Sequence, residues 1–153
     1  MKNIIAIFTV FTLILISASS FVIKGSDNMI KVSDEMIAPP QDDAAAKFPR
    51  GAKIYAEKCV ACHQVTGEGI PGAFPPLKNS DYLLADKKRA VKQVLNGSNE
   101  PMTVNGATYN VPMPFQVDNH EDAVAVINYV LNSFGNNGGT VSLDEVKDIK
   151  IIR

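Results

Sequence analysis

The sequence contains few cysteines and histidines, and this scarcity limits its disulfide and metal chemistry. The chain of 153 residues has two cysteines, Cys59 and Cys62, and two histidines, His63 and His120. The two cysteines lie next to a histidine at a spacing that suits a cofactor, which leaves no cysteine for a structural disulfide. A structural zinc site needs four ligands, and a histidine directly after the second cysteine does not match zinc-site spacing. Zinc binding is therefore disfavoured.

The sequence also lacks a strong excess of charge of either sign. Lysine and arginine number 15, and aspartate and glutamate 16, which gives a formal net charge of −1. Nucleic-acid binding calls for a concentrated basic surface, so we expect no nucleic-acid partner. The one dense basic cluster, Lys87, Lys88, Arg89 and Lys92, is expected to form the solvated face of a helix. A docking patch for an acidic partner is the alternative.

A long apolar run occurs only at the N-terminus. Lys2 is followed by the apolar stretch Ile4–Ile16 and by small residues through Ser20, an arrangement typical of a secretory signal peptide over residues 1–20. The alternative is an uncleaved anchor, because the mostly apolar run continues to Ile23 and is just long enough to span a bilayer. Both alternatives place the rest of the chain outside the cytoplasm. We expect a periplasmic protein, or one anchored to the inner membrane if the segment is not removed.

The rest of the chain divides into a linker, one domain and a short extension. Residues 21–46 are polar, mixed in charge and without periodicity, which predicts a linker. Residues 47–135 form the predicted domain. Residues 136–153 form an extension in which Ser142 and Glu145 predict a short helix, expected to pack on the surface. A domain of fewer than about 100 residues has a marginal core, so a buried cofactor would supply much of it.

The periodic segments predict a mostly α-helical domain with one short β-hairpin. Helices are expected over residues 47–59, 81–84, 87–96 and 120–134, and Asn105-Gly106 predicts the hairpin turn. The last helix has an apolar stripe formed by Ala123, Val126, Ile127, Val130, Leu131 and Phe134. This stripe is expected to pack against Gly51 and Tyr55 of the first helix, where a missing side chain allows close approach.

Cys59-Val60-Ala61-Cys62-His63 matches the C-x-x-C-H pattern of covalent haem c attachment. Residues three apart share one face of a helix, so both thiols can reach the two vinyl groups of one porphyrin. His63 then supplies the proximal ligand to the iron. A redox-active dithiol is an alternative, but it requires a βαβ context, and no strand is predicted before Cys59. The motif therefore predicts one covalently bound haem c.

A long loop rich in glycine and proline follows the motif, from Gln64 to Asn79. Loops of this length within a small domain are usually functional or wrapped around a ligand. We expect this loop to cover the proximal side of the haem, with Pro75 and Leu77 facing the cofactor.

The iron needs a second axial ligand opposite His63, and the best candidate is Met113. This methionine lies between two prolines, which restrict the backbone and hold the side chain out at low conformational cost. Met102 has only one neighbouring proline, and His120 begins a predicted helix, where an exposed imidazole is ordinary. An open sixth position is the remaining alternative. A thioether ligand would favour ferrous iron and raise the reduction potential.

Taken together, these motifs resemble the class I (mitochondrial-type) bacterial cytochromes c. The resemblance extends from about Phe48 to Gly135. It rests on an ordered set of residues: Gly51 and Tyr55, the C-x-x-C-H motif, Pro75-Pro76-Leu77, Val111-Pro112-Met113-Pro114 and Tyr129. Residues 74–77 and 80–83 further resemble cytochrome c domains associated with copper nitrite reductases and periplasmic dehydrogenases.

The resemblance implies a cytochrome c fold, in which the first and last helices cross around one covalently bound haem, near Gly51 and Tyr129. It also implies that the carbonyl of Pro75 accepts a hydrogen bond from His63 and fixes the orientation of the imidazole.

The expected function is that of a one-electron carrier cycling between Fe(III) and Fe(II), not of an enzyme. Cys59 and Cys62 would tether the haem, and His63 and Met113 would coordinate the iron. The partners would be redox proteins acting as electron donor and acceptor. One alternative is an electron-entry subunit of a periplasmic oxidoreductase complex. A less favoured alternative is a haem protein with an open site for ligand binding or catalysis.

Overall fold

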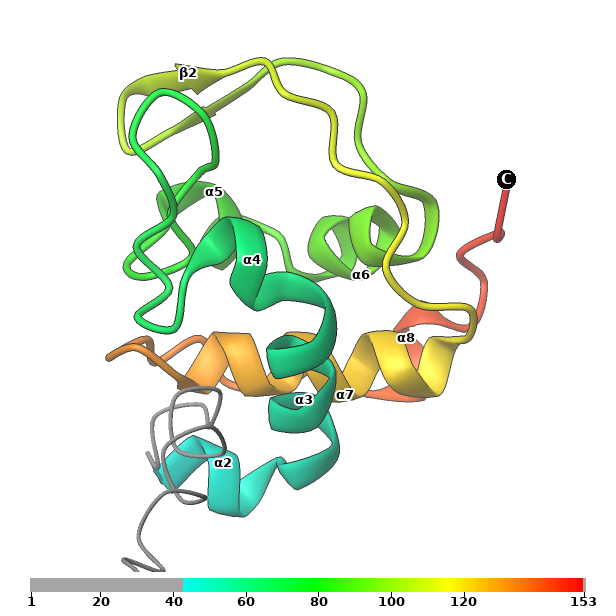
Figure 1. Ribbon diagram of the computed structural model, residues 1–153. Helices are drawn as coiled ribbons and strands as arrows, with labels where there is room; N and C mark the ends of the chain where they lie inside the picture. Colours follow the sequence, from blue (N-terminus) through cyan, green and yellow to red (C-terminus); the bar gives the residue numbers. More distant parts are fainter. Residues whose placement is uncertain (1–42, 153) are drawn as a thin grey trace, which may run out of the picture. The chain divides into compact units, whose positions relative to one another are not determined.

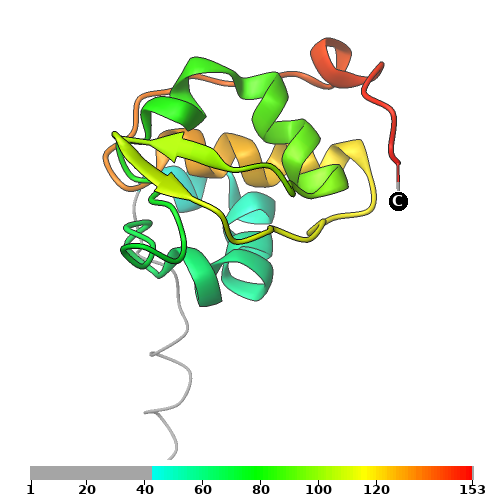
Figure 2. The same ribbon diagram turned by 90° about the horizontal axis from the view of Figure 1, so that it is seen from above.

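Helices dominate the part of the chain that the structure, a computed structural model, describes: residues 43–152 (Figures 1 and 2). In chain order the elements are α2 (Asp43–Lys47), α3 (Pro49–Ile54), the π-helical turn η1 (Tyr55–Cys59), α4 (Val60–His63), α5 (Asp81–Ala85), α6 (Lys87–Asn96), β1 (Met102–Val104), β2 (Ala107–Tyr109), α7 (His120–Asn132) and α8 (Leu143–Val146). The mostly helical fold predicted from the sequence is confirmed. The predicted signal peptide, and the predicted linker up to residue 42, lie outside the described residues. No helix within residues 43–152 is both long and apolar enough to cross a membrane.

The first helical segment of the predicted domain consists of three consecutive pieces, α3, η1 and α4. The single α-helix predicted over residues 47–59 is therefore wrong. Phe48, at φ −127° and ψ 59°, separates α2 from α3. The helix then begins at Pro49, where the missing N–H would have no intrahelical partner anyway. The π-helical turn ends at Cys59, and α4 carries the chain on to His63. Such turns are rare and often occur at functional sites.

The short helix α2 lies within the segment that the sequence predicted to be linker. Ala44 is buried in the core, and its carbonyl accepts a hydrogen bond from the Phe48 N–H at 2.8 Å. The helix also contacts α7. A helix of 5 residues is too short to show helical periodicity, so the sequence did not reveal it.

Helix α7 is the longest helix of the described residues and begins at the predicted cap. The Asn119 side-chain oxygen accepts a hydrogen bond from the Asp122 N–H at 2.8 Å. The helix ends at Asn132, two positions before the predicted end, because Ser133 is already extended, at φ −97° and ψ 171°. Phe134 and Gly135 then adopt positive φ values of 59° and 83°. Phe134 therefore leaves the helix and is not part of its stripe, although its ring still packs against the core.

Helices α3 and α7 cross in close contact, as the sequence predicted (Figures 1 and 2). A Cβ atom built at Gly51 would lie 2.1 Å from the carbonyl oxygen of Ala125 and 2.7 Å from the Cβ of Tyr129, so only glycine fits here. Next to this point, the Tyr55 ring lies 5.5 Å from the Tyr129 ring and 5.2 Å from the Phe134 ring, between centroids. Aromatic pairs at these distances contribute about 0.5–1.5 kcal/mol beyond their burial.

Helices α5 and α6 begin at the caps that the sequence indicated. The Ser80 hydroxyl accepts a hydrogen bond from the Leu83 N–H at 3.2 Å, and an Asp86 carboxylate oxygen accepts one from the Arg89 N–H at 3.0 Å. Each cap satisfies a backbone donor that the first helical turn leaves without a partner. The two predicted helix starts are therefore confirmed.

The predicted hairpin is also present, with Val104 paired to Ala107 across a two-residue turn. Asn105 and Gly106 have φ values of 51° and 81°, as a turn with two left-handed residues requires. The turn is fastened to α5: Asn105 and Asp81 each donate a backbone N–H to the other's side-chain oxygen, at 2.8 and 3.1 Å.

The C-terminal extension contains the predicted short helix, α8, with its capping box. The expectation that the extension packs on the surface is wrong, because Val141 and Val146 are fully buried in the core. The Asn128 side chain makes two hydrogen bonds to the backbone of Val141, at 2.8 and 3.0 Å. A buried side chain on α7 therefore replaces the β-sheet partner that this extended segment lacks.

The core lies where α3, α6, α7 and α8 meet. Its largest fully buried side chains are Tyr55, Val91, Leu95, Val126, Tyr129, Leu131 and Val146. Burying one large apolar side chain contributes about 1.5–3 kcal/mol. Residues on both sides of the predicted domain boundary at 135 therefore share a single core.

Replacing Gly51 with alanine tests the helix crossing. Helix propensity alone would make Gly51→Ala more stable by about 1 kcal/mol. The contact with the Ala125 backbone opposes this gain, and overpacking costs about 1–3 kcal/mol or more. We expect a net loss of at least about 1 kcal/mol in the free energy of unfolding, measured by denaturant titration. Lys53→Ala, at an exposed site on the same helix, should stay within about 0.5 kcal/mol of wild type. A Gly51→Ala protein as stable as wild type would contradict the close crossing.

Candidate functional site

A cavity of about 310 Å³ brings together residues from distant parts of the chain. Its walls come from η1, α4 and the loop after His63, from α5, α6 and α7, and from the hairpin and the loop that follows it. The volume falls in the range of small-molecule and cofactor sites, about 300–1,000 Å³. Its lining includes every cofactor-binding residue predicted from the sequence: Cys59, Cys62, His63, Pro75, Leu77 and Met113. Their roles stay predictions, but the structure places them around one space.

The two cysteines line this cavity, and neither forms a disulfide. Cys59 is buried at the end of η1, and Cys62 is half-buried on α4. Burial, and then the proximity of Cys62, raise the pKa of Cys59 to about 12. A redox-active dithiol depends on a lowered thiol pKa, so the environment of Cys59 argues against that alternative.

The imidazole of His63 is oriented by a backbone carbonyl. Its Nδ1 lies 3.0 Å from the carbonyl oxygen of Pro75, as the resemblance implied. A carbonyl can only accept, so Nδ1 carries the hydrogen, and Nε2 of the neutral ring keeps its lone pair. Burial lowers the pKa of His63 below its ordinary value, although the bond to Pro75 opposes this effect. The neutral form favoured by burial is the one that binds a metal.

The loop after His63 is closed by its own backbone hydrogen bonds. The Gly69 N–H donates to the His63 carbonyl at 3.0 Å, and the Leu77 N–H donates to the Gly67 carbonyl at 2.8 Å. Gly69 has a φ of 66°, and a Cβ built there would lie 2.4 Å from the Phe74 carbonyl oxygen and 2.6 Å from that of Pro75. Glycine at this position therefore lets the loop fold tightly enough to present the Pro75 carbonyl to His63.

Tyr55 connects the helix crossing to the C-x-x-C-H motif. Its hydroxyl donates a hydrogen bond of 2.6 Å to the carbonyl of Gln64, the residue after His63. The ring is fully buried, and this burial is the main reason why the pKa of Tyr55 is raised. The hydroxyl therefore stays a neutral donor, and the end of α4 is tied to the core.

Met113 lines the cavity from a loop that is anchored by backbone hydrogen bonds to Ser98, just after α6. Its N–H and carbonyl exchange hydrogen bonds of 2.9 and 2.8 Å with the backbone of Ser98. Gly97, at φ 80°, permits this approach, since a Cβ there would lie 2.7 Å from the Met113 carbonyl oxygen. Met102 lines the same cavity from β1, where it pairs with Tyr109. The cavity wall therefore contains both methionines that were candidates for the second axial ligand.

His120 is not part of the cavity lining. Its Nε2 lies 2.9 Å from the carbonyl oxygen of Ile149, so the side chain instead helps to hold the C-terminal segment. Within residues 43–152, no three histidine, cysteine or acidic side chains are grouped so that they could hold a metal ion. The contact with Ile149 therefore places His120 away from the predicted site.

Three charged residues of the cavity lining were not predicted from the sequence: Lys58, Asp86 and Arg89. Arg89 is the one that contradicts an expectation. It was assigned to the solvated basic cluster, but its side chain lines the cavity together with Tyr82 and Gln93. Lys88 and Lys92 of the same cluster are exposed, as predicted. Spacing gave no signal that separates Arg89 from the exposed residues, because Lys92 and Gln93, three and four residues later, lie on the same helix face as Arg89.

Comparison with known proteins identifies the family. A family model described as cytochrome c matches residues 48–134. The chain belongs to the cytochrome c family. Membership implies a covalently bound haem c, which confirms the cofactor type predicted from the C-x-x-C-H motif. The presence of a single haem stays a prediction.

Curated cytochromes c with similar sequences include both a separate protein and enzyme subunits. Cytochrome c-552 of Thermus thermophilus is 39% identical over 90 residues, which cover 56% of this chain and 68% of the relative. The cytochrome c subunit of the quinone alcohol dehydrogenase of Gluconobacter oxydans is 29% identical over 104 residues, 65% of this chain. The fructose dehydrogenase cytochrome subunit of Gluconobacter japonicus is 30% identical over 113 residues, 68% of this chain. The alignments cover only 22% of each of these two subunits.

The cavity of this cytochrome c has the donors and the walls that a haem c requires. Two thiols and a neutral imidazole line one part of it, and a methionine loop held by Ser98 lines another. Most of the remaining lining is apolar, including Leu83, Val94 and Ile127. A flat, mostly apolar macrocycle with two reactive vinyl groups suits this combination.

Replacing Gly69 with alanine tests how the loop presents the Pro75 carbonyl. Gly69→Ala and Gly72→Ala both place a side chain at positive φ, which costs about 1–2 kcal/mol. Only Gly69 has backbone atoms within 3 Å of the added Cβ, whereas Gly72 has nothing within 4 Å. We therefore expect Gly69→Ala to lose at least about 1 kcal/mol more unfolding free energy than Gly72→Ala, measured by denaturant titration. Equal losses would show that the loop accommodates the side chain without moving Pro75.

Proposed function

We propose that this cytochrome c is a one-electron carrier with one haem c, covalently bound in the cavity of about 310 Å³. The observation that carries the proposal is the joint lining of that cavity by Cys59, Cys62, His63 and Met113, which come from two segments about fifty residues apart. When bound, the haem supplies an iron that exchanges one electron between its ferric and ferrous states.

The side chains of this chain would hold the cofactor and set its potential. Cys59 and Cys62 would form the two thioether links, and His63 would ligate through the Nε2 that its bond to Pro75 leaves free. Met113 would ligate from the opposite side, supported by its two backbone bonds to Ser98. Axial ligation can move haem potentials over about 0.8 V, or about 19 kcal/mol for one electron. An exposed ion pair contributes at most about 1 kcal/mol, so ligand identity dominates.

The same arrangement supports electron transfer rather than catalysis. With both thiols and the imidazole committed to the haem, the described lining keeps no cysteine or histidine free to act as nucleophile or base. A methionine in the sixth position would leave no open site for substrate on the iron. At the rim, Val111 lines the cavity and is 48% exposed, and the nearby Phe115 is 47% exposed. These side chains offer an apolar contact for brief docking of a redox partner.

We place the protein outside the cytoplasmic membrane. The support is the N-terminal sequence, in which Lys2 and the apolar stretch Ile4–Ile16 match a secretory signal. Donor and acceptor would then be periplasmic redox proteins.

The related dehydrogenase subunits support a second candidate, an electron-entry subunit of a periplasmic oxidoreductase complex. The electron-transfer chemistry would be the same, so the distinguishing observation is the state of assembly. Affinity purification of the tagged full chain from periplasm and membranes separates the two. A stoichiometric enzyme that copurifies supports the subunit, and a protein isolated alone supports the shuttle.

Two optical spectra of the purified, exported protein test the haem and its sixth ligand. The pyridine haemochrome spectrum should report two thioether links, and the oxidised protein should show the weak far-red sulfur-to-iron band. We expect Met113→Ala to abolish that band and lower the midpoint potential, because the thioether that favours ferrous iron is lost. Met102→Ala, the matched control in the same cavity, should keep both.

Two outcomes would contradict this proposal. Loss of the far-red band in Met102→Ala, but not in Met113→Ala, would reverse the ligand assignment. A colourless protein with free or disulfide-bonded cysteines would remove the basis for electron transfer altogether.

A further inference from the structure

Asn136 is a buried polar residue in the turn that follows α7. It lies beyond residues 48–134, which the family model matches, and is 8% exposed. The Asn136 N–H donates to the Ser133 carbonyl at 2.9 Å, and the two residues between them, Phe134 and Gly135, have positive φ values of 59° and 83°. This turn directs the Asn136 side chain back against α7 and against the loop that follows His63.

The Asn136 side chain uses both of its donors and its oxygen. Nδ2 donates to the Val130 carbonyl at 2.9 Å and to the Leu77 carbonyl at 3.0 Å. Oδ1 accepts a hydrogen bond from the Asn79 N–H at 2.7 Å. Val130 belongs to the last turn of α7, where carbonyls lack partners within the helix, and Leu77 and Asn79 belong to the end of the loop. One buried side chain therefore joins the last turn of α7 to this loop.

The same turn also contacts the other side of the loop. A Cβ built at Gly67 would lie 2.5 Å from the Phe134 ring, so this ring packs directly on the Gly67 backbone. The Gly67 carbonyl accepts hydrogen bonds from the N–H groups of Leu77 and Lys78, at 2.8 and 2.9 Å. Phe134 and Asn136 therefore hold the two sides of the loop at the point where it closes on itself.

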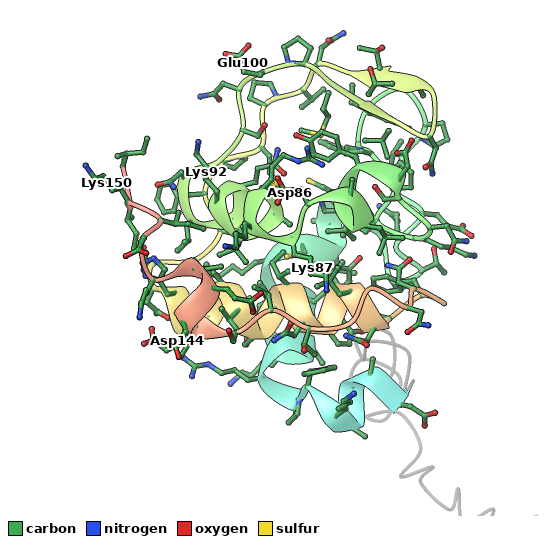
Figure 3. The ribbon with its side chains drawn as sticks, turned by 180° about the vertical axis from the view of Figure 1, so that it is seen from behind. Asp86, Lys87, Lys92, Glu100, Asp144 and Lys150 are labelled. Atoms are coloured by element: carbon green, nitrogen blue, oxygen red, sulfur yellow. The ribbon has the colours of Figure 1, made fainter. Side chains whose placement is uncertain are left out.

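The segment that carries Asn136 has its own anchors on the helices. Lys87 of α6, labelled in Figure 3, donates to the Thr140 carbonyl at 3.3 Å. The Asn128 side chain on α7 makes its two hydrogen bonds to the backbone of Val141. Neither anchor involves the loop, so Asn136 can hold the loop in place instead of moving with it.

We propose that Asn136 is a positioning residue for the proximal iron ligand. By holding the loop at Leu77 and Asn79, it keeps the nearby Pro75 carbonyl in contact with Nδ1 of His63. This inference rests on the proposed function, since it requires His63 as the ligand of a haem iron.

The position of the Pro75 carbonyl matters because an acceptor at the outer nitrogen of a ligating histidine fixes the ring and makes it a more basic ligand. A more basic ligand stabilises ferric iron and lowers the reduction potential. Asn136 therefore affects the potential without contacting the imidazole, through the carbonyl that it keeps in place.

The test compares Asn136→Ala with Asn132→Ala in the haem-containing protein. Asn132 donates two side-chain hydrogen bonds, to the carbonyls of Asn128 and Gly139, each at 2.8 Å. Neither of these two bonds involves the loop after His63. Both variants thus remove an amide that bonds backbone carbonyls near the end of α7, but only Asn136→Ala releases the loop.

Hydrogen exchange of the His63 Nδ1–H, followed by NMR in the ferrous protein, measures opening of the loop. The backbone N–H of Val126, in the buried part of α7, serves as the internal reference. We expect Asn136→Ala to speed Nδ1–H exchange about tenfold relative to this reference, because local opening no longer breaks the Asn136 bonds. The ratio of reduced to oxidised protein should shift about two- to tenfold toward the reduced form; tenfold corresponds to about 59 mV. Asn132→Ala should change neither quantity.

Three results would overturn the inference. In the first, the His63 and Val126 hydrogens accelerate equally in Asn136→Ala, which would leave Asn136 only a structural role at the end of α7. In the second, the midpoint potential of Asn136→Ala equals that of wild type or falls below it. In the third, Asn132→Ala has effects as large as those of Asn136→Ala.

If Asn136→Ala does not retain haem, Asn136→Ser takes its place. Its single hydroxyl donor keeps a polar group at the buried site but cannot serve the carbonyls of both Leu77 and Val130. The same rise in relative exchange is expected, and an unchanged ratio would overturn the inference. Failure of the proposed function itself would look different, because wild type would then give no pyridine haemochrome.

Discussion

The close crossing of α3 and α7 is the contact on which the rest of the structure depends. At Gly51 the two backbones approach so closely that no side chain fits between them. This contact places Tyr55 against Tyr129 and Phe134, and the Tyr55 hydroxyl then holds the carbonyl of Gln64 at the end of α4. The position of the C-x-x-C-H turn is thus set by a helix contact more than ten residues away from His63.

Two further walls of the cavity are loops, and backbone hydrogen bonds make them rigid in place of regular secondary structure. The loop after His63 closes through Gly67 and Gly69, which leaves the Pro75 carbonyl facing the imidazole. The loop that carries Met113 is pinned to Ser98. The two proposed iron ligands, His63 and Met113, therefore lie on separately anchored segments. Such anchoring would suit an iron site whose geometry must change little on electron transfer.

Few charged side chains line this cavity: Lys58 from η1, and Asp86 and Arg89 at the start of α6. The described lining is mostly apolar, which disfavours water around a bound cofactor, while Arg89, Tyr82 and Gln93 form a polar group next to the Met113 anchor. A mostly apolar lining is well suited to hold a haem, because the haem ring is apolar.

Much of the site and of the secondary structure could be predicted from local patterns. The C-x-x-C-H motif, the caps at Ser80, Asp86 and Asn119, and the Asn105-Gly106 turn act within a few residues, so each was visible without the fold. The errors had non-local causes. Helix α2 forms where no periodicity was visible, because Ala44 is buried in the core. The C-terminal extension is part of the core because Asn128 satisfies the backbone of Val141.

The sequence by itself determined the cofactor chemistry, because covalent attachment and proximal ligation need only a few residues at fixed spacing on one helical turn. Only the tertiary structure decided which distant residues surround that turn. Arg89 differs from Lys88 and Lys92 in the packing of α6 against α5, not in local sequence: its guanidinium stacks on Tyr82, and the residue forms part of the cavity wall. The face that a helix buries depends on its neighbours, and local sequence does not specify those.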